Sequence, residues 1–159
     1  MKYLILILVC IPTISGSSEL NLSKKEKILN RYSWMSKKLY NLYQKRSKQY
    51  NVPIKLAISV IKAESNGKVV KSRKNKNGTR DWGRFQINAV HMPNNPKKLL
   101  DDKINSKYGF WYLSLCLKKS KGYLKHAIRM YNQGLAGKEY KYKNWQYVNN
   151  VLKEYRIIF

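Results

Sequence analysis

The sequence predicts a mainly helical domain with a small irregular or β segment in its middle. Apolar residues recur at helical intervals both before residue 65 and after residue 104. Between these regions, the stretch from Gly67 to Asp81 is polar and basic, and its Asn77-Gly78 pair is typical of a tight hairpin. Residues 82–88 are expected to be compact and partly buried, and residues 92–96 to be irregular. A chain of 159 residues is sufficient for one domain with one hydrophobic core.

The first residues predict a secretory signal peptide rather than part of that core. A positive start is followed by an apolar run from Tyr3 to Pro12, which is too short to span a membrane, and then by small residues. We expect residues 1–16 to be removed, with an uncleaved anchor as the alternative. Removal takes Cys10 away and leaves Cys116 as a buried apolar side chain without a disulfide partner.

Residues 17–50 are expected to form an N-terminal helix. Ser23 and Glu26 have the spacing of a capping box, and apolar residues then follow at helical intervals as far as Leu42. The pattern predicts an amphipathic helix from about Lys24 to Tyr50, with at most one break.

The next segment, from Val52 to Glu64, predicts an apolar helix that ends near Asn66-Gly67. Its polar residues form one stripe that we expect to face solvent: Lys55, Ser59 and Lys62. Glu64 continues the opposite, apolar series. Desolvation and the negative end of the helix dipole should therefore raise its pKa above the ordinary value of about 4.3. A carboxyl group that stays protonated near neutral pH suits a general acid. The alternative is a helix-terminal Glu that is exposed or paired.

Three more helices are expected toward the C-terminus, marked by apolar residues at helical spacing: Ile104, Tyr108, Trp111 and Leu115; Leu124 to Tyr131, ending near Gly134; and Val148, Val151, Leu152 and Tyr155. Asp101 and Asp102 precede the first of these helices, where acidic residues normally cap.

The formal net charge of +25, from 33 basic and 8 acidic residues, predicts attraction to a polyanion. Export favours an anionic component of the cell envelope, and we expect no nucleic-acid partner. A basic patch would serve a purely binding role: Lys68, Lys71, Arg73, Lys74 and Lys76. With two His and one Cys left after export, the sequence predicts no metal site and no cofactor.

Four motifs occur in order: Glu64-Ser65, Gly83-Arg-Phe-Gln86-Ile-Asn88, Tyr131-Asn132-Gln-Gly134, and Tyr147-Val148 with Val151. This order resembles the soluble lytic transglycosylase family, from about Val52 to Tyr155. The resemblance implies a lysozyme-like α+β fold for a catalytic domain at 51–159 and cleavage of peptidoglycan. The insert from Arg73 to Asp81 is similar to the branch associated with type III and type IV secretion and conjugation.

Carried over position by position, the resemblance makes Glu64 the catalytic acid and gives substrate-binding roles to Gln86, Tyr131, Asn132 and Tyr147. Tyr147 also matches a tyrosine that orients the catalytic Glu. Phe85 stands where the family commonly has Met, so we expect a thioether to be missing from the cleft. Arg84 stands in place of Leu.

The predicted reaction is therefore that of a lytic transglycosylase with a single acid/base, because the chain offers few other carboxylates. The resemblance to the secretion-associated branch implies a turn-stabilising role for one of them, Asp81. The alternatives are a muramidase-type hydrolase and a non-catalytic, basic wall-binding module. We expect an exported monomer in the periplasm or cell envelope, without a membrane anchor after signal cleavage. Its expected partners are peptidoglycan glycan strands and components of a secretion system.

Overall fold

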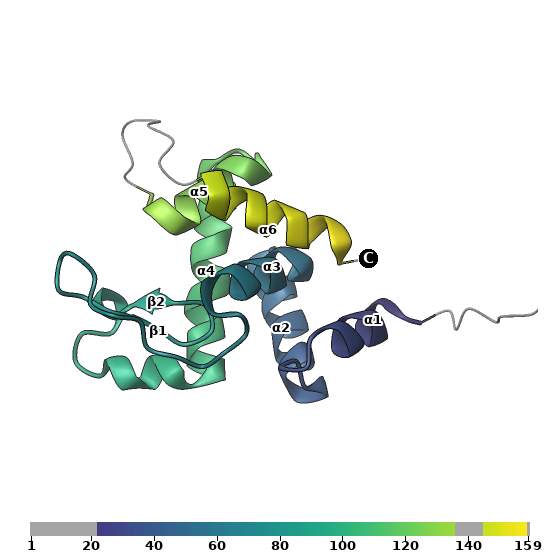
Figure 1. Ribbon diagram of the computed structural model, residues 1–159, viewed down its shortest axis with the longest axis horizontal. Helices are drawn as coiled ribbons and strands as arrows, with labels where there is room; N and C mark the ends of the chain where they lie inside the picture. Colours follow the sequence, from purple (N-terminus) through teal and green to yellow (C-terminus); the bar gives the residue numbers. More distant parts are fainter. Residues whose placement is uncertain (1–21, 136–144, 159) are drawn as a thin grey trace, which may run out of the picture.

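The structure is a computed structural model that describes residues 22–135 and 145–158. The predicted signal peptide at 1–16 lies outside this part of the chain. The described residues form six α-helices and one two-stranded sheet, which confirms the mainly helical fold class with a small β segment (Figure 1). None of the described helices is long and apolar enough to cross a membrane.

The N-terminal region contains two helices, α1 (Lys24–Arg31) and α2 (Lys37–Tyr50), so the single permitted break is present. The predicted capping box at the start of α1 is also present: the Ser23 hydroxyl accepts from the Glu26 amide, and the Glu26 carboxylate accepts from the Ser23 amide. A second serine, Ser36, caps α2 by accepting from the Leu39 amide at 3.1 Å.

Helix α3 (Ile54–Ser65) is the most buried element, with an unbroken buried stretch from Leu56 to Ile61. Placing Ser59 on a solvent-facing stripe was wrong, because its side chain is fully buried and its hydroxyl donates to the Lys55 carbonyl at 2.7 Å. Helix α6 (Trp145–Ile157) packs across this side of α3, and the Lys55 ammonium lies 4.2 Å from the centroid of the Tyr155 ring. The sequence pattern could not show that a distant helix covers part of the polar stripe.

Helix α4 (Asp102–Lys119) is central and packs against α2 and α5 (Leu124–Gln133). Asp101 caps α4 as predicted, since its carboxylate accepts from the amides of Lys103 and Ile104. Cys116 is fully buried, also as predicted. An aromatic cluster joins three parts of the chain: Tyr43 of α2, Phe85 of the turn after β1, and Phe110 of α4, with ring centroids 5.5–5.8 Å apart.

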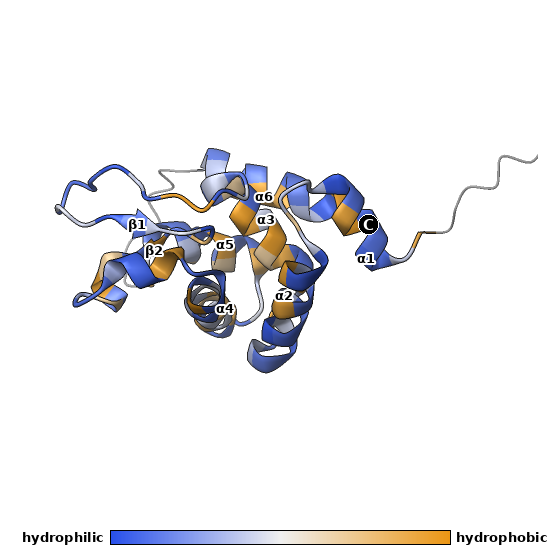
Figure 2. Cartoon of the chain, turned by 90° about the horizontal axis from the view of Figure 1, so that it is seen from below, coloured by the Kyte–Doolittle hydropathy of each residue, from blue (hydrophilic) through white to orange (hydrophobic). Residues whose placement is uncertain are grey.

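The β segment consists of β1 (Asp81–Trp82) and β2 (Ile87–Asn88), paired antiparallel with Asp81 opposite Asn88. A hairpin precedes it, in which the Ser72 amide donates to the Asp81 carbonyl and the Asn75 amide to the Thr79 carbonyl, both at 2.8 Å. The predicted Asn77-Gly78 turn is the tip of this hairpin. Two short 3-10 helices, η1 (Ala89–His91) and η2 (Pro96–Leu100), then lead to α4. The segment between α3 and β1 is largely hydrophilic, whereas the helices turn apolar faces inward (Figure 2).

Candidate active site

Glu64 lies in the last turn of α3, which ends at Asn66 in the left-handed conformation (φ 52°). Its carboxyl group is enclosed deeply yet stays partly accessible. The Tyr147 hydroxyl, contributed by α6, donates to Glu64 Oε1 at 2.6 Å. Burial raises the pKa of Glu64 to about 7, the negative charge of Asp81 also raises it, and the bond from Tyr147 opposes both. The predicted rise of this pKa is confirmed, and its main cause is desolvation.

A cleft of about 560 Å³ opens beside this carboxyl group. Such a volume is typical of a site that encloses a ligand of several rings. The walls come from the end of α3, the hairpin before β1, strands β1 and β2 with the turn between them, the 3-10 helix η1, one face of α4, and the end of α5. Gln86 and Asn132 line the cleft with Glu64, whereas Tyr147 lies behind the Glu64 carboxyl group and is not part of the wall.

The turn between β1 and β2 is tightly fixed beneath the cleft. Gly83 has a φ of 74°, and a Cβ at this position would lie 2.3 Å from the Asn105 side chain, so only glycine fits here. The buried Asn105 side chain donates to the Trp82 carbonyl at 2.8 Å and accepts from the Phe85 amide at 2.9 Å. A single buried amide therefore holds both ends of the turn.

Phe85 lies in the core and not in the cleft. It is fully buried, and its ring occupies the space that the missing side chain of Gly109 leaves. A Cβ on Gly109 would lie 2.3 Å from the Phe85 ring. The position at which the resemblance implied a thioether in the cleft is therefore occupied by a residue of the core.

Gln86 follows with a φ of 49°, an uncommon left-handed conformation for a residue with a side chain. Its amide nitrogen donates to the carbonyls of Gly83 at 2.6 Å and Val70 at 3.2 Å. With both N–H groups engaged by the backbone, the amide oxygen is the atom of Gln86 that can accept from a ligand.

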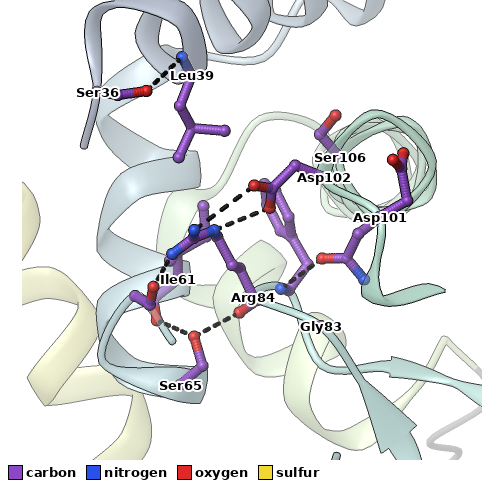
Figure 3. A network of polar contacts seen from close by, with 12 residues as sticks. Ser36, Leu39, Ile61, Ser65, Gly83, Arg84, Asp101, Asp102 and Ser106 are labelled. Atoms are coloured by element: carbon purple, nitrogen blue, oxygen red, sulfur yellow. Dashed lines mark hydrogen bonds and ion pairs between the residues drawn. The ribbon is translucent and has the colours of Figure 1, made fainter. Parts of the chain in front are cut away.

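A network behind the site fastens the end of α3 to this turn (Figure 3). The Ser65 hydroxyl lies between two carbonyls, those of Ile61 at 3.2 Å and Arg84 at 2.8 Å. The Arg84 guanidinium forms a salt bridge with Asp102 at 2.8 Å and also donates to the Gly67 carbonyl. Arg84 therefore connects the C-terminal end of α3 to the N-terminal end of α4. The resemblance to the family did not suggest this structural role.

Tyr131 and Asn132 are adjacent in α5 but make different contacts. The Tyr131 hydroxyl donates to the Phe85 carbonyl at 2.8 Å, and burial raises the pKa of this hydroxyl well above its usual value. Tyr131 therefore presents its ring to the cleft while its hydroxyl holds the turn. Asn132 is exposed at the wall of the cleft.

Asp81 lines the same cleft as Glu64. Its two carboxylate oxygens accept from the Asn88 amide at 2.7 Å and from the Asn75 amide at 3.1 Å. These bonds across the hairpin agree with the expected turn-stabilising role. The sequence did not reveal that the same carboxylate also faces the cleft, where its charge raises the pKa of Glu64.

One wall of the cleft is aromatic: His91, Tyr108, Trp111 and Tyr112. The His91 ring lies 5.9–6.3 Å from the rings of the other three residues, and Trp111 is 39% exposed. The sequence analysis gave His91 no role and took Tyr108 and Trp111 only as markers of a helix. These aromatic residues fall on a different face of α4 from Gly109, Phe110 and Leu113, which are buried. The helical spacing alone does not indicate which of the two faces meets the core.

The other acidic residues that the structure describes lie elsewhere in the fold: Glu26 and Asp101 cap helices, Asp102 pairs with Arg84, and Glu154 pairs with Arg31. Glu19 and Glu139 fall outside the described ranges. Within residues 22–135 and 145–158, no three His, Cys, Asp or Glu side chains gather in a way that could hold a metal ion.

Comparison with known families agrees with this geometry. The sequence model of the family described as Transglycosylase SLT domain matches residues 41–151, which is more than half of the chain. No curated protein and no solved structure matches the chain significantly. The chain therefore belongs to the transglycosylase SLT family: it is a lytic transglycosylase domain with a lysozyme-like fold that acts on the glycosidic bonds of peptidoglycan. Its substrate lies outside the cytoplasmic membrane, and so does its place of action.

Proposed function

We propose that this lytic transglycosylase cleaves the β-1,4 bond between N-acetylmuramic acid and N-acetylglucosamine with Glu64 as both acid and base. One observation carries the proposal: Glu64 lines the cleft with a pKa of about 7, so a large fraction of the carboxyl groups holds a proton near neutral pH. An exposed glutamate with an ordinary pKa of 4.5 would be almost fully ionised there.

The proposed reaction has two proton transfers. Glu64 first donates its proton to the glycosidic oxygen, and the bond from that oxygen to C1 of the muramoyl residue breaks. The C6 hydroxyl oxygen of the same sugar then bonds to C1, and its proton passes to the Glu64 carboxylate. The product is a 1,6-anhydromuramoyl end, no water is consumed, and Glu64 is protonated again for the next cycle.

The cleft also offers groups that fit an amino sugar. The amide oxygen of Gln86 and the side chain of Asn132 suit hydroxyl and N-acetyl groups. The exposed Trp111 ring, with Tyr108 and Tyr112 beside it, suits the apolar face of a pyranose ring. We assign substrate binding to Gln86 and Asn132 directly. Tyr131 contributes to substrate binding through its ring, which lines the cleft. Tyr147 acts indirectly, through the hydrogen bond that its hydroxyl donates to Glu64.

Mass spectrometry of the muropeptides released from purified sacculi tests this proposal. We expect anhydro-muropeptides from the wild type and no release from Glu64→Gln. Normal folding of the variant, checked by circular dichroism, separates loss of chemistry from loss of structure. Reducing-end muropeptides from the wild type would contradict the proposed product, and cleavage by a folded Glu64→Gln variant would remove Glu64 from its role.

A muramidase-type hydrolase remains the second candidate because Asp81 lines the same cleft. A second carboxylate is what a hydrolase uses to direct water at the sugar. Against this, both Asp81 oxygens already accept hydrogen bonds from asparagine amides. Incorporation of ¹⁸O from labelled water into the product, lost in Asp81→Asn, would favour the hydrolase.

We also propose that the enzyme is exported by the signal peptide at 1–16 and opens the wall locally for a secretion apparatus. The Asn/Lys/Gly-rich hairpin that ends at Asp81 supports the similarity to the secretion-associated branch of the family. A cleft formed within one chain supports action as a monomer. Co-purification of secretion components with the tagged, full-length protein tests the partner. Size-exclusion chromatography with light scattering tests the monomer.

A further inference from the structure

The segment between α3 and β1 carries five exposed cations: Lys68, Lys71, Arg73, Lys74 and Lys76. The sequence contains no acidic residue from Ser65 to Arg80. Both salt bridges within the described parts of the chain involve other arginines, Arg31 and Arg84. None of these five cations has a role in the proposed cleavage reaction.

The hairpin that bears these cations is built into the wall of the cleft. The Arg80 guanidinium donates to the Ser72 carbonyl at 2.8 Å and so joins its two arms. The Asn75 amide reaches both Thr79 and Asp81 at 3.1 Å. Asn75 and Asn77 line the cleft, whereas Lys74 and Lys76, their neighbours in the chain, are exposed. Lys74 and Lys76 therefore lie at the rim of the cleft, and Arg73 is next to Lys74 on the same arm of the hairpin.

We propose that the basic hairpin from Ser72 to Asp81 binds, through Arg73, Lys74 and Lys76, the carboxylates of the peptide stems that the glycan strand carries. The inference rests on the proposed function and deepens it by naming a second part of the substrate. The sugar backbone of the strand is neutral, whereas the stems attached to muramoyl residues carry carboxylates that are ionised at neutral pH. Charges interact over roughly 8 Å in physiological salt, so a stem that leaves the cleft beside Asn75 and Asn77 would be attracted by the neighbouring cations.

The position of the hairpin favours stems over a separate polyanion. An anionic group that is covalently attached to the strand is brought to the rim whenever the strand occupies the cleft, so weak surface contacts act at a high effective concentration. A nucleic acid has no such attachment to the neutral cleft. Phosphate-bearing wall polymers share the anionic chemistry of the stems, and the experiment separates these two sources.

The test compares three enzymes, the wild type and two variants, on two strand substrates, with sacculi that retain phosphate polymers as a further control. The variant Arg73→Gln/Lys74→Gln/Lys76→Gln removes three cations from the hairpin and leaves Asn75, Asn77 and Asp81 in place. The matched control, Lys38→Gln/Lys45→Gln/Lys48→Gln, removes the same charge from exposed positions of α2, away from the cleft. The substrates are phosphate-free glycan strands with their stems and the same strands after an amidase has removed the stems. Because this hydrolysis leaves a lactyl carboxylate on each muramoyl residue, these carboxylates are converted to neutral amides before the assay.

On strands with stems, we expect the hairpin variant to raise KM about tenfold at low salt, because each exposed ion pair changes affinity by roughly 1.4- to 5-fold. The kcat value should stay within about twofold, since no group of the proposed chemistry is altered. Removing the stems should raise the KM of the wild type to the same extent, and the hairpin substitutions should then add nothing further. The α2 control should behave as the wild type.

Other outcomes overturn the inference. An equal rise of KM in the α2 control would mean that net charge alone attracts the substrate. A full effect of the hairpin variant on stem-free strands would mean a contact with the sugars. An effect that appears only on sacculi with phosphate polymers would make phosphate the ligand. Failure of the wild type on both substrates would overturn the proposed function itself, whereas cleavage of both without the expected coupling would overturn only the stem subsite.

Discussion

Replacing Glu64 by Gln should stabilise the folded protein at pH 8 while it abolishes cleavage. Burial disfavours the charged form of this carboxyl group. Ionisation of Glu64 therefore lowers the free energy of unfolding. Gln is the matched substitution, because it has nearly the same shape and keeps a side-chain oxygen that can accept from the Tyr147 hydroxyl, now 2.6 Å from Glu64 Oε1.

The size of the effect follows from the pKa of Glu64, which burial raises from 4.5 to about 7 on folding. Between these values the folded protein binds more protons at this site than the unfolded chain does, so the free energy of unfolding falls as the pH rises. At about 1.36 kcal/mol for each pH unit, the loss is on the order of 3 kcal/mol once the pH exceeds 7. The neutral Gln side chain avoids this loss.

Urea denaturation of both proteins at pH 4, 6 and 8 measures the difference. The two should differ little through ionisation at pH 4, and the advantage of Glu64→Gln should grow to about 3 kcal/mol at pH 8. Glu26→Gln is the control with the opposite sign, because hydrogen bonds from Ser23 lower the pKa of Glu26. A difference between Glu64→Gln and wild type that stays constant with pH would refute a desolvated carboxyl group at this position.

Three further substitutions follow from the same contacts. Tyr147→Phe removes the bond that lowers the pKa of Glu64, so the alkaline limb of the kcat/KM profile should move up by about 1 pH unit; no movement would exclude this bond from the reaction. Asp81→Asn removes a charge that raises the same pKa, so the alkaline limb should move down, and an upward movement would contradict the assigned effect. Gly109→Ala should destabilise the fold by about 1–3 kcal/mol in urea, because its methyl group meets the Phe85 ring, and adding Phe85→Met should restore part of the loss if this contact is the cause.

The extent of sequence-based prediction differs between elements for physical reasons. Local signals predicted the ends of helices well: the Ser23 capping box, the Asp101 cap and the Gly134 stop are all present. These features depend on hydrogen bonds between residues close in the chain. Ser59 was misplaced because its burial depends on α6, and a periodicity within α3 contains no information about a helix so distant in sequence.

The same distinction applies to the candidate site. Glu64 stood out because a carboxylate in an apolar series is rare, and its raised pKa was expected from burial and from the helix dipole; burial is the largest cause in the structure. The aromatic wall on α4 was taken as a core marker, because Tyr108 and Trp111 at helical spacing look the same whether they face a core or a cleft. At position 85 the resemblance implied only that a thioether is missing from the cleft, because the direction of the Phe85 side chain depends on the space above Gly109, a long-range packing feature.

The opposing influences on Glu64 explain how one carboxyl group can serve in both proton transfers. Burial alone would favour the acid and leave the carboxylate too unstable to accumulate after it has protonated the glycosidic oxygen. The Tyr147 hydroxyl, 83 residues away in the sequence, donates to that carboxylate and stabilises it. Because the C6 hydroxyl must then return a proton to the same group, a pKa near the working pH serves both steps better than a strongly acidic or strongly basic group. The packing of α6 against α3 thus contributes to the proposed chemistry as well as to the fold, because it brings this tyrosine to the end of α3.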